Sequence, residues 1–311
     1  MKIFDMHNDM GTNLYERYLN SEDNVFESYH LTNLQKGEVK GLFCACFFSG
    51  EEDYKYMQNM ILHANEVLDR QKEVVKVSTS SDLKESDKIH ILISVEGMCV
   101  IKDDVENQVD WLYKHNVKVA SLVWNEENAL ASGWPNNPLN GLSKLGKRVV
   151  KKMNELKMII DVSHINEKGF WDIVELSDMP IIATHSNARA LCNHQRNLTD
   201  QQIKAIGLKG GLIGLNAARH FISDIEEECT AYTLAKHGKY IADLIGVDHV
   251  AIGFDYMDFL NDYGQDSMAL DLTDASYSQN LVLGLKQVGF NEEEIAKICY
   301  KNVEDFLMKY L

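Results

Sequence analysis

Two stretches of the sequence decide how the chain folds: residues 159–164 read IIDVSH, and residues 181–186 read IIATHS. Each begins with an apolar run and contains one histidine, His164 or His185, and a segment with helical apolar spacing lies between them at residues 167–176. This order is typical of a strand, a crossover helix and a second, parallel strand. Because parallel strands of one sheet end at the same edge, we expect the two histidines to lie side by side there.

Apolar runs of the same kind recur along the chain and alternate with helical segments, which predicts an α/β fold of the (β/α)8 TIM-barrel type. We expect Ser143 and Thr199 to cap two of the helices. One domain is predicted over residues 1–311, with a helical tail at 276–311 packed on the outside. The predicted strands are 3–6, 39–48, 90–95, 117–123, 159–164, 181–186, 211–216 and 247–254, and the clearer helices are 52–70, 105–115, 143–156, 167–176 and 230–245.

A doubly wound open sheet is the competing architecture for such an alternation. That fold usually binds its ligand through a glycine-rich first turn. The first turn here reads His-Asn-Asp at residues 7–9 instead, which is a metal-ligand composition.

Composition narrows the class of partner. The chain carries a net charge of −16 at pH 7, with 45% hydrophobic and 25% charged residues. Polyphosphate surfaces would repel it, so nucleic acid and anionic membranes are disfavoured and a small-molecule substrate is expected. The first residues are too polar for a signal peptide, and no run approaches the roughly 18 apolar residues of a membrane span. These features predict a cytoplasmic protein; the oligomeric state is left open, a homodimer being one option.

Six cysteines are scattered through the predicted elements, which favours reduced, buried thiols over a disulfide framework. Cys44 and Cys46 are two residues apart in one predicted strand and therefore share a face, which leaves a metal role open. Core packing is the favoured interpretation, because free cysteine is among the most buried residue types. The six are Cys44, Cys46, Cys99, Cys192, Cys229 and Cys299.

Histidines and carboxylates follow the predicted strands where each strand ends. In a barrel these ends meet on one face, where TIM-barrel active sites lie. Such ligands suit zinc or a similar divalent ion, and five of them exceed what one four-coordinate catalytic site uses. We therefore expect two metals, one held by His7 and Asp9 and the other by His164 and His185, with Glu96 between them. The strand-end residues are His7, Asp9, Glu96, His164, His185 and Asp255.

No single element of this set is specific, because a lone His-x-Asp or a lone strand-end carboxylate is common. The combination, in order and at strand ends, carries the inference. Eight further histidines are interpreted as structural or solvated, His30 and His237 being the least certain among them.

The sequence resembles the membrane (renal) dipeptidase family of the amidohydrolase superfamily over almost its whole length. The resemblance is carried by DMHND at residues 5–9, SVEG at 94–97, DVSH at 161–164, HSNAR at 185–189, RN at 196–197 and GVDHVAIGFD at 246–255. It implies a TIM-barrel metallopeptidase with two zinc ions on the ligands given above and Glu96 bridging. It also implies that Arg196 binds the substrate's terminal carboxylate, that Asp255 handles a proton, and that dipeptides with a D-residue at the carboxyl side are accepted.

Two departures from the family pattern bear on substrate preference and rate. Vertebrate members carry a histidine at the end of the fourth strand that helps to polarise the substrate carbonyl, and here Trp124 and Asn125 stand in that region. After the eighth strand the family often shows Asp-Phe-Asp-Gly, and here residues 255–258 read DYMD, which raises the question of whether Asp258 assists Asp255.

The expected chemistry is attack on the peptide carbonyl by a hydroxide that two divalent cations share. Asn125 is expected to donate to the oxyanion and Asp255 to carry the proton to the leaving amine. Arg196 is expected to bind a carboxylate through its planar fork. Trp124 is expected to narrow the pocket in favour of compact dipeptides.

Three alternatives stay open at this point. One is another amidohydrolase that acts on N-acyl amino acids or cyclic amides, and a second is a non-catalytic metal-containing binding protein. The third is a barrel that handles nucleotides or sugar phosphates, for which the sequence offers no glycine-rich phosphate loop; the region after the seventh strand reads NAAR at residues 216–219.

Overall fold

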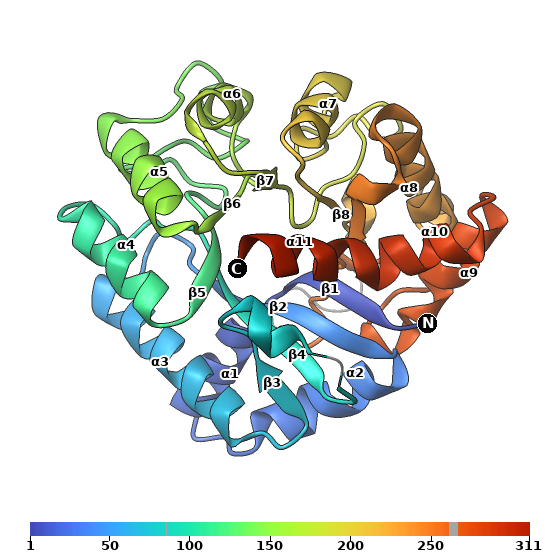
Figure 1. Cartoon of the computed structure of the whole chain (residues 1–311), viewed down its shortest axis with the longest axis horizontal. Coiled ribbons are helices and arrows are strands. Elements are labelled where there is room, and N and C mark those ends of the chain that lie inside the picture. Colours follow the sequence, from blue (N-terminus) through green and yellow to red (C-terminus); the bar gives the residue numbers. More distant parts are fainter. Residues whose placement is uncertain (85, 261–266) are drawn as a thin grey trace.

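Eight apolar runs of the sequence become the parallel strands of one nearly closed barrel (Figure 1). The computed structural model describes residues 1–84, 86–260 and 267–311. The strand order is β7-β6-β5-β4-β2-β1-β9-β8, and a parallel bridge between Ala183 and Ile213 joins its two ends. The predicted TIM barrel is confirmed. The strands are β1 (Ile3–Asn8), β2 (Val39–Phe47), β4 (Ile89–Glu96), β5 (Val117–Ser121), β6 (Ile159–Asp161), β7 (Ile181–Ile182), β8 (Ile213–Leu215) and β9 (Val250–Ile252).

Successive side chains along these strands pack alternately into two hydrophobic clusters, one inside the barrel and one between the barrel and its helices. In β2, Phe43 belongs to a cluster inside the barrel, whereas Leu42 and Cys44 belong to the cluster that the surrounding helices share. Successive strand residues point to opposite faces, and strands covered on both faces read as continuous apolar runs. This is why the strands were visible in the sequence although none shows a clean alternation.

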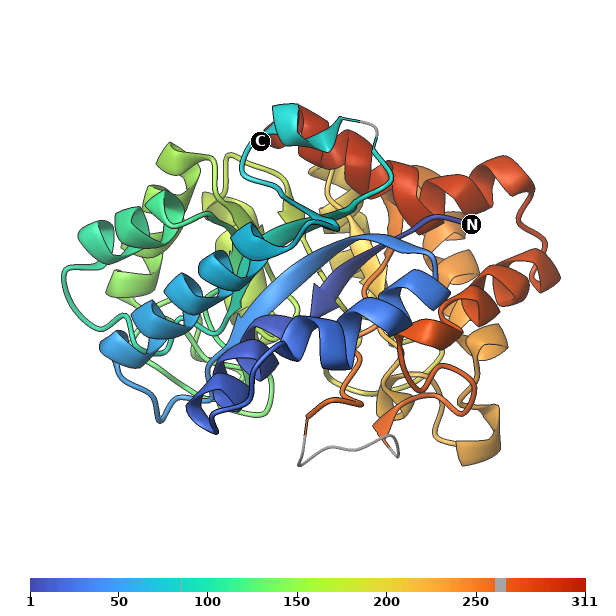
Figure 2. The ribbon, with the colours of Figure 1, turned by 90° about the horizontal axis from the view of Figure 1, so that it is seen from below.

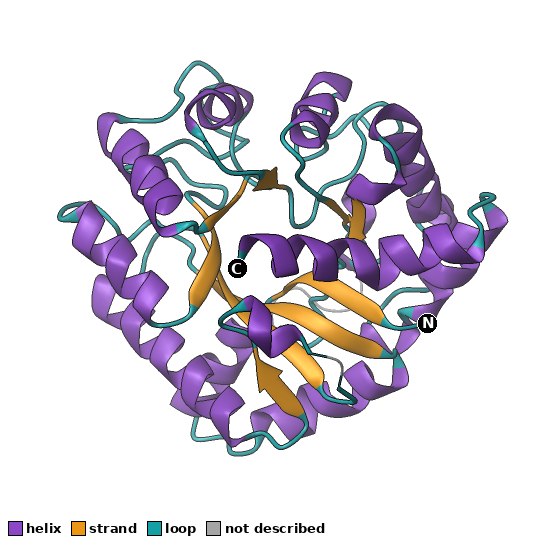
Figure 3. Cartoon of the chain, in the orientation of Figure 1, coloured by secondary structure: helices purple, strands orange, loops and turns teal. Residues whose placement is uncertain are grey.

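Helices surround the barrel and connect its strands (Figure 3). The predicted caps are present, since Ser143 accepts from the backbone N–H of Gly146 and Thr199 forms a capping box with Gln202. Within the described residues, no helix has both the length and the apolar character needed to cross a membrane. The helices are α1 (Met10–Leu19), α2 (Thr32–Lys36), α3 (Tyr54–Arg70), α4 (Val105–Lys114), α5 (Lys144–Leu156), α6 (Glu167–Leu176), α7 (Asp200–Leu208), α8 (Ala231–Ile245), α9 (Gln279–Gln287), α10 (Glu292–Ala296) and α11 (Asn302–Tyr310).

Two α-helices and one short strand were absent from the predicted set. Helices α1 and α2 occupy the connection between β1 and β2, and the short strand β3 (Val74–Lys76) pairs with β4 outside the barrel path. The segment that forms α1 mixes apolar residues with many polar ones, so its spacing gave a weak helical signal.

The carboxyl-terminal tail corrects one expectation. Helix α9 packs against α8 on the outside as predicted, but α11 crosses one end of the barrel (Figures 1 and 2). Its residues Val303, Phe306 and Leu307 join the interior cluster that contains Phe4 and Phe43. Large apolar side chains inside a barrel need a cover at its end, and α11 supplies it.

All six cysteines are buried free thiols, as expected. Burial raises the pKa of Cys44 to about 12, so this thiol stays protonated near neutral pH. A neutral, buried thiol fits the packing interpretation, because thiolate is the metal-ligating form.

Leu307→Ala is expected to lower the free energy of unfolding by about 2–5 kcal/mol, because it leaves a cavity where α11 covers the barrel interior. Met308→Ala is the matched control, since Met308 is 53% exposed whereas Leu307 is 0% exposed; it should stay within about 0.5 kcal/mol of the unmodified protein. Urea titration followed by circular dichroism measures both. Equal, small losses for the two variants would mean that α11 is not part of the barrel core.

Candidate metal centre

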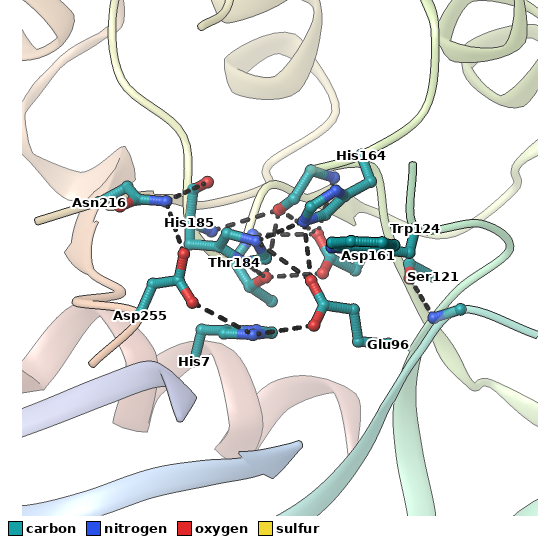
Figure 4. Close-up of polar contacts among 12 residues, drawn as sticks. His7, Glu96, Ser121, Trp124, Asp161, His164, Thr184, His185, Asn216 and Asp255 are labelled. Atoms are coloured by element: carbon teal, nitrogen blue, oxygen red, sulfur yellow. Dashed lines mark hydrogen bonds and ion pairs between the residues drawn. The ribbon is translucent and has the colours of Figure 1, made fainter. Parts of the chain in front are cut away.

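The strand ends bring the predicted ligands together at one face of the barrel, where Figure 4 shows His7, Glu96, His164, His185 and Asp255. Asp9 groups there with His7 and Asp255. Glu96 is the last residue of β4, and His164, His185 and Asp255 follow β6, β7 and β9 within three residues. His7 is the last residue but one of β1, where the pairing with β2 shifts register between Asp5 and Asn8. Such an irregularity re-aims side chains at the rim of a barrel.

Asp5 ties the first strand to the ninth at this point. Its Oδ1 accepts hydrogen bonds from the backbone N–H of His7 at 3.2 Å and of Phe254 at 2.8 Å. The backbone N–H of Asp255 donates in turn to the carbonyl of His7 at 3.2 Å. His7 and Asp255 are therefore held next to each other although almost the whole chain separates them in sequence.

Glu96 lies between two groups of candidate ligands. Its Oε1 is 2.7 Å from Nε2 of His164 and 3.4 Å from Nε2 of His185. Its other oxygen, Oε2, is 3.4 Å from Nε2 of His7. The two oxygens of one carboxylate thus face different histidines, which is the placement that a bridging ligand needs.

The second group surrounds His7. Its Nε2 is 3.7 Å from Oδ1 of Asp9 and 3.8 Å from Oδ1 of Asp255. Nε2 of His7 and Oδ1 of Asp9 are buried and lack a hydrogen-bond partner among the described residues. Leaving buried polar atoms unpaired is costly, and a cation between them would satisfy both.

Hydrogen bonds fix the tautomer of His164. Nε1–H of Trp134 donates to Oδ1 of Asn125 at 2.7 Å, which identifies that atom as the carboxamide oxygen because indole nitrogen only donates. Nδ1 of His164 lies 3.0 Å from the same oxygen and must therefore donate to it. The lone pair of His164 is consequently on Nε2.

A hydroxyl and a carboxylate fix His185 in the same way. The Thr184 hydroxyl donates to Oδ2 of Asp161 at 2.6 Å, so its oxygen accepts from Nδ1–H of His185 at 2.7 Å. Asp161 is itself held by the backbone N–H groups of Ser163 and Thr184, each at 3.0 Å. The lone pair of His185 is therefore also on Nε2.

Three acceptors consequently converge. The Nε2 atoms of His164 and His185 are 2.9 Å apart, and Oε1 of Glu96 lies within 3.4 Å of both. Lone pairs aimed at one another repel unless a cation lies between them. Imidazole and carboxylate are the ligands that zinc and similar divalent ions take, so the residues present fit such an ion.

Burial and charge set the protonation states of the cluster. Burial, helped by Arg196, lowers the pKa of His164 to about 4, and burial also lowers the pKa of His185 well below its ordinary value, so both imidazoles are in the neutral, metal-binding form. Burial opposes charge on His7, yet Glu96 and Asp9 outweigh it and raise its pKa well above the ordinary value. The carboxylates around His7 thus attract positive charge.

Comparison with known proteins agrees with this geometry. A model of the membrane dipeptidase family, peptidase family M19, matches residues 1–306. The chain belongs to this family. Dipeptidase AC, a metallopeptidase of family M19, superimposes with a TM-score of 0.86 at 26% identity, covering 100% of this chain and 98% of its own.

Two further proteins are similar to this chain, one in structure and one in sequence. A metallopeptidase from Rhodobacter sphaeroides, liganded with a phosphinate mimic of the dipeptide L-Ala-D-Ala, has a TM-score of 0.86 at 25% identity and covers 100% of this chain and 99% of its own. An uncharacterized protein from Klebsiella pneumoniae is 35% identical over 201 residues, which are 61% of this chain and 71% of that protein. The resemblance to the membrane dipeptidase family found in the sequence is confirmed.

Arg196 lies behind the histidines of the candidate metal centre. It is buried, and its guanidinium donates to the backbone carbonyls of Ser163 and His185 and to Oγ of Ser186. Its Nη2 also lies 3.1 Å from Nε2 of His164. The arginine is therefore within reach of a ligand bound at the candidate metal centre.

Asp255 has an unusual backbone and a fixed side chain. Its φ is 62°, in the left-handed region that few non-glycine residues adopt and that is enriched at functional sites. Nδ2 of Asn216 donates to its Oδ2 at 3.1 Å. Burial raises the pKa of Asp255 to about 8; His7 opposes this, whereas Asp9 and Glu96 add to it.

Sequence reasoning gave no role to Asp161, Thr184 or Asn216. The first two lie inside the family motifs, directly beside the histidines, and Asn216 directly follows β8. Residues that follow a barrel strand at its carboxyl end were the signal that could have found Asn216. Asp258 lines a different, small pocket beside Asn8 and His30, and burial raises its pKa to about 7.

The side chains of Trp124 and Asn125 have different surroundings: Trp124 lines the cavity, whereas Asn125 contacts His164. The Trp124 ring lies edge-on to Phe47, with centroids 4.8 Å apart, and lines the cavity over the metal centre. The Asn125 oxygen faces His164 and Trp134 instead. Its expected role as oxyanion donor stays a prediction, and this geometry favours a positioning role on His164.

Asn125→Leu is expected to weaken binding of a divalent cation by roughly 10–100-fold, the usual effect of losing a residue that orients a metal ligand. Titration of metal-free protein with Zn2+ in the presence of an indicator measures the affinity. Asn125→Asp is the matched control, because it keeps an acceptor oxygen and removes the N–H donor. If Asn125 positions His164, the Asn125→Asp variant should keep its metal affinity and turnover. A loss of about 10²–10³ in kcat at unchanged metal content would instead identify Asn125 as an oxyanion donor.

Proposed function

We propose that this member of the membrane dipeptidase family hydrolyses the peptide bond of small dipeptides, including those with a D-residue at the carboxyl side, with two divalent cations, zinc or a similar ion. The observation that carries the proposal is the convergence of Nε2 of His164, Nε2 of His185 and Oε1 of Glu96. A second set of buried acceptors around His7 shares the same glutamate. Membership of a metallopeptidase family supports this interpretation.

His7 and Asp9 would hold one cation, His164 and His185 the other, and Glu96 would contact both. Cations bound there supply Lewis acidity, which polarises the amide carbonyl and makes water a stronger nucleophile near neutral pH. The ligand atoms of Glu96, His164 and His185 all lie within 4.8 Å of one another, as do those of His7, Asp9 and Asp255, so each set is compact enough to hold a cation.

Arg196 would bind the terminal carboxylate of the dipeptide. A planar guanidinium matches a carboxylate with two parallel hydrogen bonds, and burial strengthens this pairing. The bonds to the carbonyls of Ser163 and His185 hold the guanidinium in place. A carboxylate placed there directs the scissile bond toward Glu96.

Asp255 would move the proton. Asn216 holds its Oδ2, which leaves Oδ1 directed toward His7 and the metal centre. Cations bound at His7 and Glu96 would lower the raised pKa of this carboxyl toward the range in which it accepts a proton near neutral pH. The same group can return the proton to the leaving amine.

Acceptance of a D-residue is supported by the Rhodobacter sphaeroides relative, whose bound phosphinate mimics L-Ala-D-Ala. That protein aligns with this chain over its full length at 25% identity. The proposal for this chain is correspondingly tested with both L,L and L,D dipeptides.

Glu96→Gln is expected to reduce the metal content from two ions per chain to about one and to abolish most dipeptide hydrolysis, because a neutral amide bridges two cations poorly. Elemental analysis and turnover of L-Ala-D-Ala are the measurements. Glu106→Gln, on the surface in α4, is the control and should change neither quantity. One ion per unmodified chain, or a Glu96→Gln variant that retains two ions and normal turnover, would contradict the binuclear proposal.

Arg196→Lys is expected to raise KM for a dipeptide with a free carboxyl terminus much more than it lowers kcat, because the charge stays and the fork is lost. The carboxamide analogue of the same dipeptide should change little. Metal content is measured in parallel, since Arg196 contacts the loops that carry His164 and His185. Equal losses on both substrates would identify a structural arginine.

A further inference from the structure

A cavity of about 300 Å³ opens over the metal centre and continues away from it. Asp9, Glu96, Trp124, His164 and Asp255 line its inner part. Asp9 is buried, and its Oδ1, which lies 3.7 Å from Nε2 of His7, lacks a hydrogen-bond partner among the described residues. The outer part is built from α1, the segment between β2 and α3, the first turns of α3 and the residues after β9.

The outer part combines apolar walls with carboxylates. Phe47, Met60, Met257 and Leu260 supply apolar surface, and Glu16 and Glu52 supply negative charge. Among the described residues that line the cavity, none is a lysine or an arginine. This composition suits a ligand group with an apolar stem and a cationic end.

Local structure holds the carboxylates in place. Oε1 of Glu52 accepts from the backbone N–H and the hydroxyl of Ser49, at 3.1 and 2.9 Å, and Oε2 accepts from the N–H of Gly50 at 3.0 Å. These bonds fix the position of the Glu52 carboxylate at the cavity. Glu16 follows Thr12 by four residues in α1, which puts both on the cavity side of the helix.

The direction of the substrate decides which of its parts reaches this space; this step rests on the proposed function. Arg196 lies on the side of His164 and His185 and does not line the cavity. With the terminal carboxylate on Arg196 and the scissile carbonyl at Glu96, the amino-terminal residue lies toward Asp9. Its side chain then extends into the outer part of the cavity.

We propose that the outer cavity selects dipeptides with a basic amino-terminal side chain, lysyl or arginyl. The methylene stem packs on Phe47 and Met60, and the cationic end is attracted by Glu16 and Glu52. The net charge of −16 favours the approach of cationic substrates in the same sense. Glu16 and Glu52 are thereby specificity-determining residues, separate from the residues of the metal centre.

The test compares L-Lys-L-Ala with L-norleucyl-L-Ala, which has the same four-carbon stem and no ammonium group, and with L-Glu-L-Ala, all on the zinc-loaded protein. The lysyl substrate is expected to have a kcat/KM about tenfold above that of the norleucyl substrate, mainly through KM. The ratio should fall as salt is raised, because screening weakens charge–charge attraction. The glutamyl substrate should be the poorest.

Variants of Glu16 and Glu52 test whether these carboxylates cause the preference for the lysyl substrate. Glu16→Gln and Glu52→Gln are each expected to reduce the lysyl-to-norleucyl ratio roughly twofold to fivefold, the usual worth of a partly exposed ion pair. Glu16→Lys should shift preference toward the glutamyl substrate. Glu27→Gln, an exposed glutamate outside this cavity, makes the same change in net charge and should leave the ratio unchanged.

The outcomes separate this proposal from the one it rests on. Equal hydrolysis of lysyl and norleucyl dipeptides, or a ratio that Glu16→Gln, Glu52→Gln and Glu27→Gln change alike, overturns the selectivity and leaves the dipeptidase activity standing. Failure of the zinc-loaded protein to hydrolyse any dipeptide overturns both.

Discussion

Two imidazole nitrogens and one carboxylate oxygen, all of them acceptors, are buried within 3.4 Å of one another at the open end of the barrel. Positive charge relieves the repulsion among these atoms: Nη2 of Arg196 lies 3.1 Å from Nε2 of His164, and a cation bound between the acceptors would add to this effect. The surrounding structure must therefore both enforce the approach and leave room for a cation. The rigid strands do the first, since Glu96 ends β4 and the histidines follow β6 and β7. Every other feature of the site depends on this juxtaposition.

Outer hydrogen bonds make the approach chemically specific. Asn125 and Thr184 each accept from the Nδ1–H of one histidine, so both Nε2 lone pairs face Glu96. Trp134 and Asp161 hold those acceptors in turn. These successive hydrogen bonds fix the orientation of the two imidazole rings. Residues that do not contact a metal can therefore influence its binding.

The two ends of the barrel serve different purposes. Helix α11 covers one end with Val303, Phe306 and Leu307, which complete an apolar interior together with Phe4 and Phe43. The opposite end carries the charged cluster and a cavity with carboxylates at its outer part. Stability and recognition are thereby separated along the barrel axis, so the loops around the cavity can vary in sequence without disturbing the interior that α11 covers.

The sequence by itself determined the eight strands, the barrel and the set of residues that meets at its end. This was predictable because buried parallel strands are continuous apolar runs, and because the residue that follows a barrel strand always lies at the same face. The sequence did not reveal that Asn125 faces His164, that Asn216 holds Asp255, that Arg196 lies buried behind the histidines, or that α11 covers the barrel. Asn125 and His164, like Asn216 and Asp255, are 39 residues apart, and Arg196 is 32 residues from His164. Only the folded paths of these segments bring the partners within hydrogen-bonding or packing distance.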